Sequence, residues 1–116
     1  MDFTGKSIVI TGASSGIGRQ LAIVLAREGA RITLAARDAQ ALEEVVRECG
    51  NAGGRSIAVP TDVSDQASCD ALIKAAVEAF GGVDVLVNNA GISMWGRFDE
   101  MTDLGMVERI MRVNYF

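Results

Sequence analysis

A glycine-rich segment near the N-terminus has the residue types and spacing of a phosphate-binding turn. The segment reads Thr11-Gly12-Ala13-Ser14-Ser15-Gly16-Ile17-Gly18. It follows a β-branched run and precedes a helical pattern, which is the context in which such a motif is informative. A pyrophosphate bound there would accept hydrogen bonds from the N–H groups at the helix N-terminus, where the helix dipole also favours negative charge. The chemistry expected of this segment is therefore the binding of a phosphorylated ligand.

Each polar or glycine position of the segment has a physical reason. A side chain at Gly12 or Gly16 would block the approach of the phosphates or forbid the turn, and one at Gly18 would push the helix away from the strand. The hydroxyls of Ser14 and Ser15 can donate further hydrogen bonds. The alternative is a glycine-rich turn that binds nothing. The position after the first strand of a βαβ unit favours binding.

The elements that position this turn follow from the periodicity of the apolar residues. Strands are predicted at 7–11, 31–35, 56–59 and 83–87. Helices are predicted from 17 to 29, from 39 to 49, from 65 to about 80, and from 103 to the C-terminus. Alternating strands and helices predict an α/β fold with a doubly wound, Rossmann-like parallel sheet. One domain over residues 1–116 would stop after the fourth strand and the start of the following helix.

Two details of the helices bear on the turn. The first helix is predicted from apolar residues that recur at helical spacing, namely Ile17, Leu21, Val24 and Leu25. The second is preceded by Asp38, whose carboxylate is predicted to cap it.

Composition and charge exclude several classes of partner. With 11 Lys and Arg against 15 Asp and Glu, the formal net charge is −4, and the basic residues are scattered singly. We therefore expect neither nucleic acid nor a membrane as a partner. Cys49 and Cys69 have no metal-ligand spacing and the chain has no histidine, so no metal site is predicted. Without a signal-peptide pattern or an apolar run of about 20 residues, the expected location is cytoplasmic.

The spacing of the glycine segment is Thr-Gly-x-x-x-Gly-x-Gly, and in this the sequence closely resembles the short-chain dehydrogenase/reductase family. Three further motifs fit the same family: Asp62-Val63 after the third strand, Asn88-Asn89-Ala90-Gly91 after the fourth, and Asn114 inside the last helix. The resemblance covers the chain from about Lys6 onward. It implies the N-terminal, dinucleotide-binding half of such a protein.

The resemblance also implies which residues hold the dinucleotide. The glycine turn, including Ile17, would hold the pyrophosphate. Asp62 would accept a hydrogen bond from the adenine amino group, with Val63 alongside; a capping or turn aspartate is the alternative interpretation of Asp62. Thr11 would brace the turn that follows the fourth strand. The adenosine ribose and the approach to the nicotinamide would be lined by Asn88, Ala90 and Gly91.

The end of the second strand distinguishes the two nicotinamide dinucleotides. Enzymes that use NAD place an acidic side chain there, which accepts from both ribose hydroxyls and repels a 2′-phosphate. This chain has Ala36 followed by Arg37, whose guanidinium can bind a phosphate with two hydrogen bonds and stack on the adenine. Asp38 is better explained as a helix cap. NADP(H) is therefore predicted in preference to NAD, and a solvated Arg37 that binds nothing is the alternative.

The resemblance implies hydride transfer between the nicotinamide and a carbonyl/alcohol substrate. In the family a tyrosine beside a lysine acts as acid/base, a serine orients the substrate, and a helix asparagine, matched by Asn114, holds a water of the proton relay. The serine and the Tyr-x-x-x-Lys pair lie further along in the family. We therefore expect this chain to supply the cofactor-binding half and to be inactive alone. The alternative is a catalytically inactive dinucleotide-binding or interaction module that ends at residue 116.

The fourth predicted strand gives a first testable prediction. Val83, Val85, Leu86 and Val87 are typical of a strand covered on both faces, yet this strand would lie at the edge of the sheet. Because an apolar edge with unpaired amides promotes self-association, we predict a homo-oligomer of marginal stability. Sedimentation of the dilute chain should show a dimer or larger species. A monomer with one cooperative unfolding transition would contradict this expectation.

Overall fold

The computed structural model of the chain describes residues 3–14 and 16–88. In chain order its elements are β1 (Ser7–Thr11), α1 (Gly16–Arg27), β2 (Arg31–Ala36), α2 (Ala39–Asn51), β3 (Arg55–Pro60), α3 (Gln66–Phe80) and β4 (Val85–Asn88). All four predicted strands and the first three predicted helices are present in the predicted order. The site residues Ser15, Ala90, Gly91 and Asn114, and the helix expected from Asp103, lie outside the described residues.

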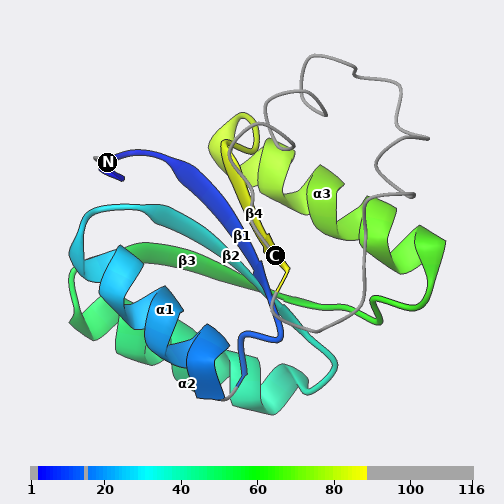
Figure 1. Cartoon of the computed structure of the whole chain (residues 1–116), viewed down its shortest axis with the longest axis horizontal. Helices are drawn as coiled ribbons and strands as arrows, with labels where there is room; N and C mark the ends of the chain where they lie inside the picture. The colour runs from blue at the N-terminus through cyan, green and yellow to red at the C-terminus, as the bar shows by residue number, and fades with distance from the viewer. Residues whose placement is uncertain (1–2, 15, 89–116) are drawn as a thin grey trace.

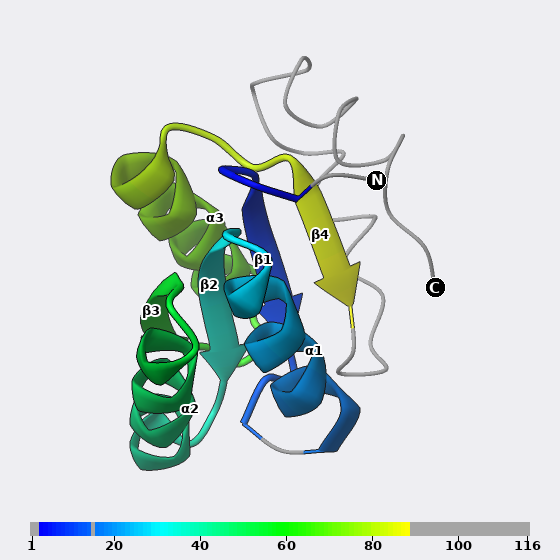
Figure 2. The same ribbon diagram turned by 90° about the vertical axis from the view of Figure 1, so that its left-hand side faces the viewer.

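The strands form one parallel sheet in the order β3-β2-β1-β4. Helices α1 and α2 cover one face of the sheet, and α3 covers the other (Figure 1; Figure 2). From β1 the chain moves outward to β2 and β3, and it then crosses back so that β4 lies on the opposite side of β1. This reversal makes the sheet doubly wound and confirms the predicted Rossmann-like class.

The central strand β1 is apolar on both faces because helices cover both faces. Ile8 and Ile10 belong to the core cluster that includes residues of α1 and α2, whereas Val9 between them belongs to the cluster that includes residues of α3. All three side chains are completely buried. This alternation is the two-residue period of a strand, and it explains why the sequence of β1 is continuously apolar.

The buried face of α1 consists mainly of small residues, and Leu25 is the large residue among them. The buried residues of the helix are Gly18, Ala22, Leu25 and Ala26. Ile17 is 78% exposed and Val24 is 47% exposed, so among the large apolar residues that define the spacing only Leu25 is buried. Small residues on this face allow the helix backbone to approach the sheet closely. The spacing predicted the helix correctly but did not identify its buried side.

Apart from β1, the strand boundaries differ from the prediction by one or two residues, and the largest difference is at the start of the fourth strand. β4 begins at Val85 rather than at 83. Asp84, the residue before β4, makes two hydrogen bonds to β1. Its N–H donates to the Ser7 carbonyl oxygen at 2.8 Å, and its carboxylate accepts from the Ser7 N–H at 2.9 Å. The side chain therefore takes the place of a backbone acceptor where the ladder starts. This contact explains the single charged residue in an otherwise apolar run.

The loop between α2 and β3 approaches α1 so closely that it leaves no room for a side chain at Gly54. A Cβ at this position would lie 2.5 Å from the Ala26 Cβ and 2.7 Å from the Ala26 Cα. We predict that Gly54→Ala lowers the free energy of unfolding by about 1–3 kcal/mol, because α1 or the loop must shift. Urea denaturation measures the change. The matched control is Gly50→Ala in α2, where a Cβ meets no atom within 4 Å.

The control substitution replaces a helical glycine with alanine, so it should leave stability unchanged or raise it by up to about 1 kcal/mol. Equal effects of Gly54→Ala and Gly50→Ala would show that the close approach to Ala26 does not limit the packing of α1.

Candidate functional site

The carboxyl ends of the four parallel strands meet at one edge of the sheet. In this register Thr11 lies opposite Asn88, and Ala36 lies opposite Pro60. The segments that follow β1, β2 and β3 are therefore neighbours, and they carry the predicted glycine turn, Arg37 and Asp62. The topology brings together predicted site residues that are distant in the sequence, as ligand sites of open α/β sheets require.

The glycine turn between β1 and α1 needs glycine for conformational reasons. Gly12 has φ 62° and Gly16 has φ 59°, in the left-handed region that side chains disfavour. A Cβ on Gly16 would meet no atom within 4 Å, so backbone conformation and not crowding within the chain accounts for this glycine. Gly18 lies in the buried face of α1, where the sequence predicted that a side chain would separate helix and strand.

The N-terminus of α1 is suited to an anion. The N–H groups of a first helical turn have no acceptor within the helix, and the helix dipole places partial positive charge there. The first turn of α1 contains no acidic residue that would repel a phosphate. Ser14 lies in the turn just before the helix and is partly exposed. These features fit the pyrophosphate of a dinucleotide.

Thr11 and Asn88 are in contact across the β1–β4 pair. The Thr11 hydroxyl oxygen lies 3.1 Å from Asn88 Oδ1 and 3.4 Å from the Val87 carbonyl oxygen. Thr11 is fully buried, so its hydroxyl is held in a fixed place. The structure thus contains the expected contact of Thr11 with Asn88, while the turn that follows Asn88 lies outside the described residues.

Arg37 and Asp62 form an ion pair across the ends of β2 and β3. Arg37 Nη2 lies 3.0 Å from Asp62 Oδ1. The loop that carries Asp62 is tied to β2, because the Thr61 N–H donates to the Ala36 carbonyl oxygen at 2.8 Å. Two residues that were predicted independently to contact the adenosine end of a dinucleotide therefore contact each other.

Asp62 also holds the turn in which it lies. Its Oδ1 accepts from the Ser64 N–H at 3.0 Å and from the Ser64 hydroxyl at 2.6 Å. These two hydrogen bonds, followed by the ion pair with Arg37, lower the pKa of Asp62 from its ordinary 3.8 to about 2. These contacts confirm the interpretation of Asp62 as a turn aspartate, and they are compatible with a second role in binding.

The neighbouring aspartates are committed to helix caps. Asp38 accepts from the Ala41 N–H at 3.1 Å at the start of α2, as predicted. Asp65 accepts from the Ser68 N–H at 3.2 Å at the start of α3. With Asp38 used in this way, Arg37 is the charged residue after β2 that does not cap α2. Val63 is half-buried and packs against the core cluster on the α3 face.

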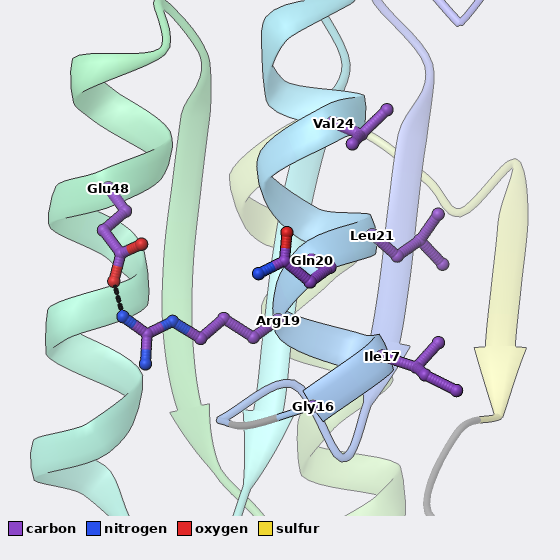
Figure 3. A pocket seen from close by; sticks show the side chains of 7 residues that line it. All are labelled: Gly16, Ile17, Arg19, Gln20, Leu21, Val24 and Glu48. Carbon is purple, nitrogen blue, oxygen red and sulfur yellow. Dashed lines mark hydrogen bonds and ion pairs between the residues drawn. The ribbon is translucent and has the colours of Figure 1, made fainter.

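A shallow apolar groove lies along α1 beside the glycine turn. Figure 3 shows Ile17, Leu21 and Val24 on the edge of α1 that turns away from α2, while Arg19 reaches across to form an ion pair with Glu48 of α2. The groove has a volume of about 700 Å³. Ile17 is thus exposed directly after the turn, where it can contact a ligand bound there.

Sequence reasoning missed two polar contacts of this region. Ser64, which fixes the Asp62 carboxylate, could have been found from the Asp-x-Ser spacing, since aspartate commonly accepts from the backbone two residues on. The Arg19–Glu48 pair joins residues 29 positions apart and has no signal in the sequence. It links α1 to α2 behind the glycine turn.

The helices in the described ranges, 3–14 and 16–88, include none with both the length and the apolar character that a membrane span needs. Within the same residues, no three His, Cys, Asp or Glu side chains gather to hold a metal ion.

Comparison with known proteins gives a consistent set of relatives. The sequence model of the family described as short chain dehydrogenase matches residues 6–116. The 11-beta-hydroxysteroid dehydrogenase-like 2 of Arabidopsis thaliana is 39% identical over 116 residues, which cover 97% of this chain and 37% of that protein. Dehydrogenase/reductase SDR family member 7 of Mus musculus is 41% identical over 118 residues, covering 98% of this chain and 35% of that protein.

Solved structures share the fold. A short chain dehydrogenase/reductase from Burkholderia phymatum in complex with NAD is 46% identical with a TM-score of 0.72, and the match covers 75% of this chain and 31% of that one. The glucose dehydrogenase of Caenorhabditis elegans in its apo-form is 39% identical with a TM-score of 0.74, over 85% of this chain and 43% of that one. This chain thus spans between 31% and 43% of the length of these four relatives.

The hydrogen bonds around Asp62 give a prediction about its titration. Ser64→Ala removes the hydroxyl donor and should raise the pKa of Asp62 from about 2 toward 3.8. The pKa of Asp62 in the folded chain is lower than its ordinary value. The ionised carboxylate therefore stabilises the fold above about pH 4, and this contribution is lost as the pH falls toward 2. The carboxyl carbon chemical shift, followed by NMR against pH, measures the pKa.

Ser68→Ala is the matched control, because the Ser68 hydroxyl accepts from the Asp62 N–H and does not contact the carboxylate. An unchanged Asp62 pKa in Ser64→Ala, or an equal rise in both variants, would contradict the assignment of the shift to the Ser64 hydroxyl.

Proposed function

The chain belongs to the short-chain dehydrogenase family, and we propose that it forms the dinucleotide-binding half of an NADP(H)-dependent oxidoreductase. The relatives are much longer than this chain, so the reaction of the whole protein is part of the proposal. The nicotinamide, when bound, would exchange a hydride with a carbonyl/alcohol substrate. The residues described above would bind and orient the dinucleotide.

The observation that carries the choice of NADP(H) is Arg37 at the carboxyl end of β2. Its side chain is 75% exposed and lies at the edge where a dinucleotide would cross the sheet. Asp38 is occupied as the cap of α2, so no acidic side chain at the end of β2 is left to accept from both ribose hydroxyls. A guanidinium at this place supports recognition of a 2′-phosphate.

We assign the remaining contacts to the dinucleotide from the pyrophosphate outward. The pyrophosphate would lie on the glycine turn against the N-terminus of α1, held by Gly12, Ser14, Ser15, Gly16, Ile17 and Gly18. Asp62 would accept from the adenine amino group, with Val63 beside the ring. Asn88, which contacts Thr11, would line the adenosine ribose. Together with Ala90 and Gly91 it would also line the approach to the nicotinamide.

The family alone does not decide the cofactor. The relative from Burkholderia phymatum, at 46% identity, was solved in complex with NAD. The preference for NADP(H) therefore depends on Arg37 and on the cap formed by Asp38, both of which belong to this chain. Binding of a 2′-phosphate by Arg37 is therefore the property that tests this preference.

Among the residues of this chain, we assign a part in the catalytic step to Asn114. In the helix that the sequence predicts after the fourth strand, it would hold a water of the proton relay. The alternative, an inactive binding or interaction module, makes the same binding predictions and differs in turnover. The coding sequence downstream of Phe116 separates the two: a Tyr-x-x-x-Lys pair supports the oxidoreductase, and a genuine stop codon supports the module.

We further propose that the protein acts as a homo-oligomer. The exposed Ile17 and Val24 of α1 leave apolar surface that a second copy could cover.

Substitution of Arg37 tests the proposed cofactor. Arg37→Met keeps an apolar side chain against the adenine but removes the charge. It should weaken binding of adenosine 2′,5′-bisphosphate by about ten-fold or more, and change binding of 5′-AMP by less than about two-fold. Isothermal titration calorimetry measures both dissociation constants.

Arg47→Met, at an exposed position of α2, is the control for the loss of one positive charge, and it should affect neither ligand. If Arg37→Met weakened both ligands equally, or neither, Arg37 would not recognise the 2′-phosphate and the preference for NADP(H) would be wrong.

A further inference from the structure

Arg37 is held by a partner that is itself fixed in place. Asp62 accepts from the N–H and the hydroxyl of Ser64, and its own N–H donates to the Ser68 hydroxyl at 2.9 Å. The Asp62 side chain is 43% exposed, against 75% for Arg37. The carboxylate is therefore the fixed member of the ion pair, and the longer guanidinium side chain is the member that can move.

Asp62 differs from the aspartates on either side of it. The carboxylates of Asp38 and Asp65 accept from N–H groups at the start of α2 and α3, where the helix dipole balances their charge. Asp62 instead neutralises the guanidinium of Arg37, with 3.0 Å between nitrogen and oxygen. A 2′-phosphate that binds Arg37 must share this guanidinium with the carboxylate or displace the carboxylate from it.

The two oxygens of Asp62 have separate surroundings. Arg37, the Ser64 N–H and the Ser64 hydroxyl all contact Oδ1. Oδ2 makes no hydrogen bond to any residue in the ranges that the structure describes, 3–14 and 16–88. An adenine amino group could therefore donate to Oδ2 while Oδ1 keeps Arg37, so recognition of adenine and the effect on the 2′-phosphate are separable.

From this geometry we propose that Asp62 is a specificity-determining residue that limits the preference for NADP(H) over NAD. Its carboxylate lowers the affinity of Arg37 for a 2′-phosphate by pairing with the guanidinium and by repelling the phosphate. An unphosphorylated ribose does not require Arg37, so binding of NAD is unaffected by this pair. The inference rests on the proposed function and adds the counter-ion that sets how strongly the two cofactors are distinguished.

The experiment compares two ligands on the 116-residue chain, adenosine 2′,5′-bisphosphate and 5′-AMP. The selectivity is the ratio of their dissociation constants, measured by calorimetry at low salt. Asp62→Asn keeps the shape of the side chain and an oxygen acceptor for Ser64 but removes the charge. It should raise the selectivity for the bisphosphate about two- to five-fold, as expected of an exposed ion pair. In high salt the gain should shrink because the charges are screened.

Two comparisons make the test specific. Asp65→Asn removes one negative charge from the same loop without touching Arg37, and asparagine still caps α3, so the selectivity should stay unchanged. In an Arg37→Met background, Asp62→Asn should no longer change the selectivity. Asp62→Ser, which also keeps an acceptor for the turn, serves if Asp62→Asn does not fold.

The outcomes separate this inference from the proposed function. If Arg37→Met abolishes the selectivity while Asp62→Asn leaves it unchanged, the cofactor is NADP(H) and Asp62 does not set the preference. A gain in Asp62→Asn that equals the gain in Asp65→Asn, or that persists without Arg37, also overturns the inference. If Arg37→Met leaves the selectivity unchanged, or the unaltered chain binds neither ligand, the proposed function fails and the inference fails with it.

Discussion

Parallel pairing of β1 with both β2 and β4 is the constraint on which the rest of the structure depends. Parallel strands bring their carboxyl ends to one edge of the sheet, so Thr11 meets Asn88 although 77 positions separate them. Parallel strands also require crossover connections, and here these are helices on both faces. Every residue of β1 is consequently buried, and the polar residues of the candidate site lie at or after the carboxyl ends of the strands.

At that edge, the function of each charged residue depends on its position relative to the helix ends. Asp38 and Asp65 lie directly before helices and are used as caps, whereas Asp62 lies in a turn and pairs with Arg37. Arg37, the residue from which we propose NADP(H) binding, is thus accompanied by its own counter-ion. A binding site of this kind would recognise a phosphate by competition between two anions for one guanidinium, rather than by an unpaired positive charge.

The apolar surface of α1 has two separate uses. Gly18, Ala22 and Ala26 pack on the sheet, because only small side chains allow a helix to lie so close to it. Ile17 and Val24 remain exposed on the edge of the helix that turns away from α2, and Ile17 lies next to the glycine turn. Two of the large residues that made the helix recognisable are therefore available for contacts outside the described fold. Burial followed from side-chain size at the interface and not from hydrophobicity alone.

The sequence by itself determined the elements, their order and the family, because these depend on local patterns. A strand or helix period extends over a few neighbours, and caps such as Asp38 join residues three positions apart. The glycine turn could be identified for the same reason. Only the tertiary structure decided that Ile17 is exposed and that Arg37 pairs with Asp62, 25 positions away. The exposure of Ile17 and the pairing of Arg37 with Asp62 both depend on which strands become neighbours. The packing of helices on the two faces of the sheet decides this, and it involves residues that are distant in the sequence.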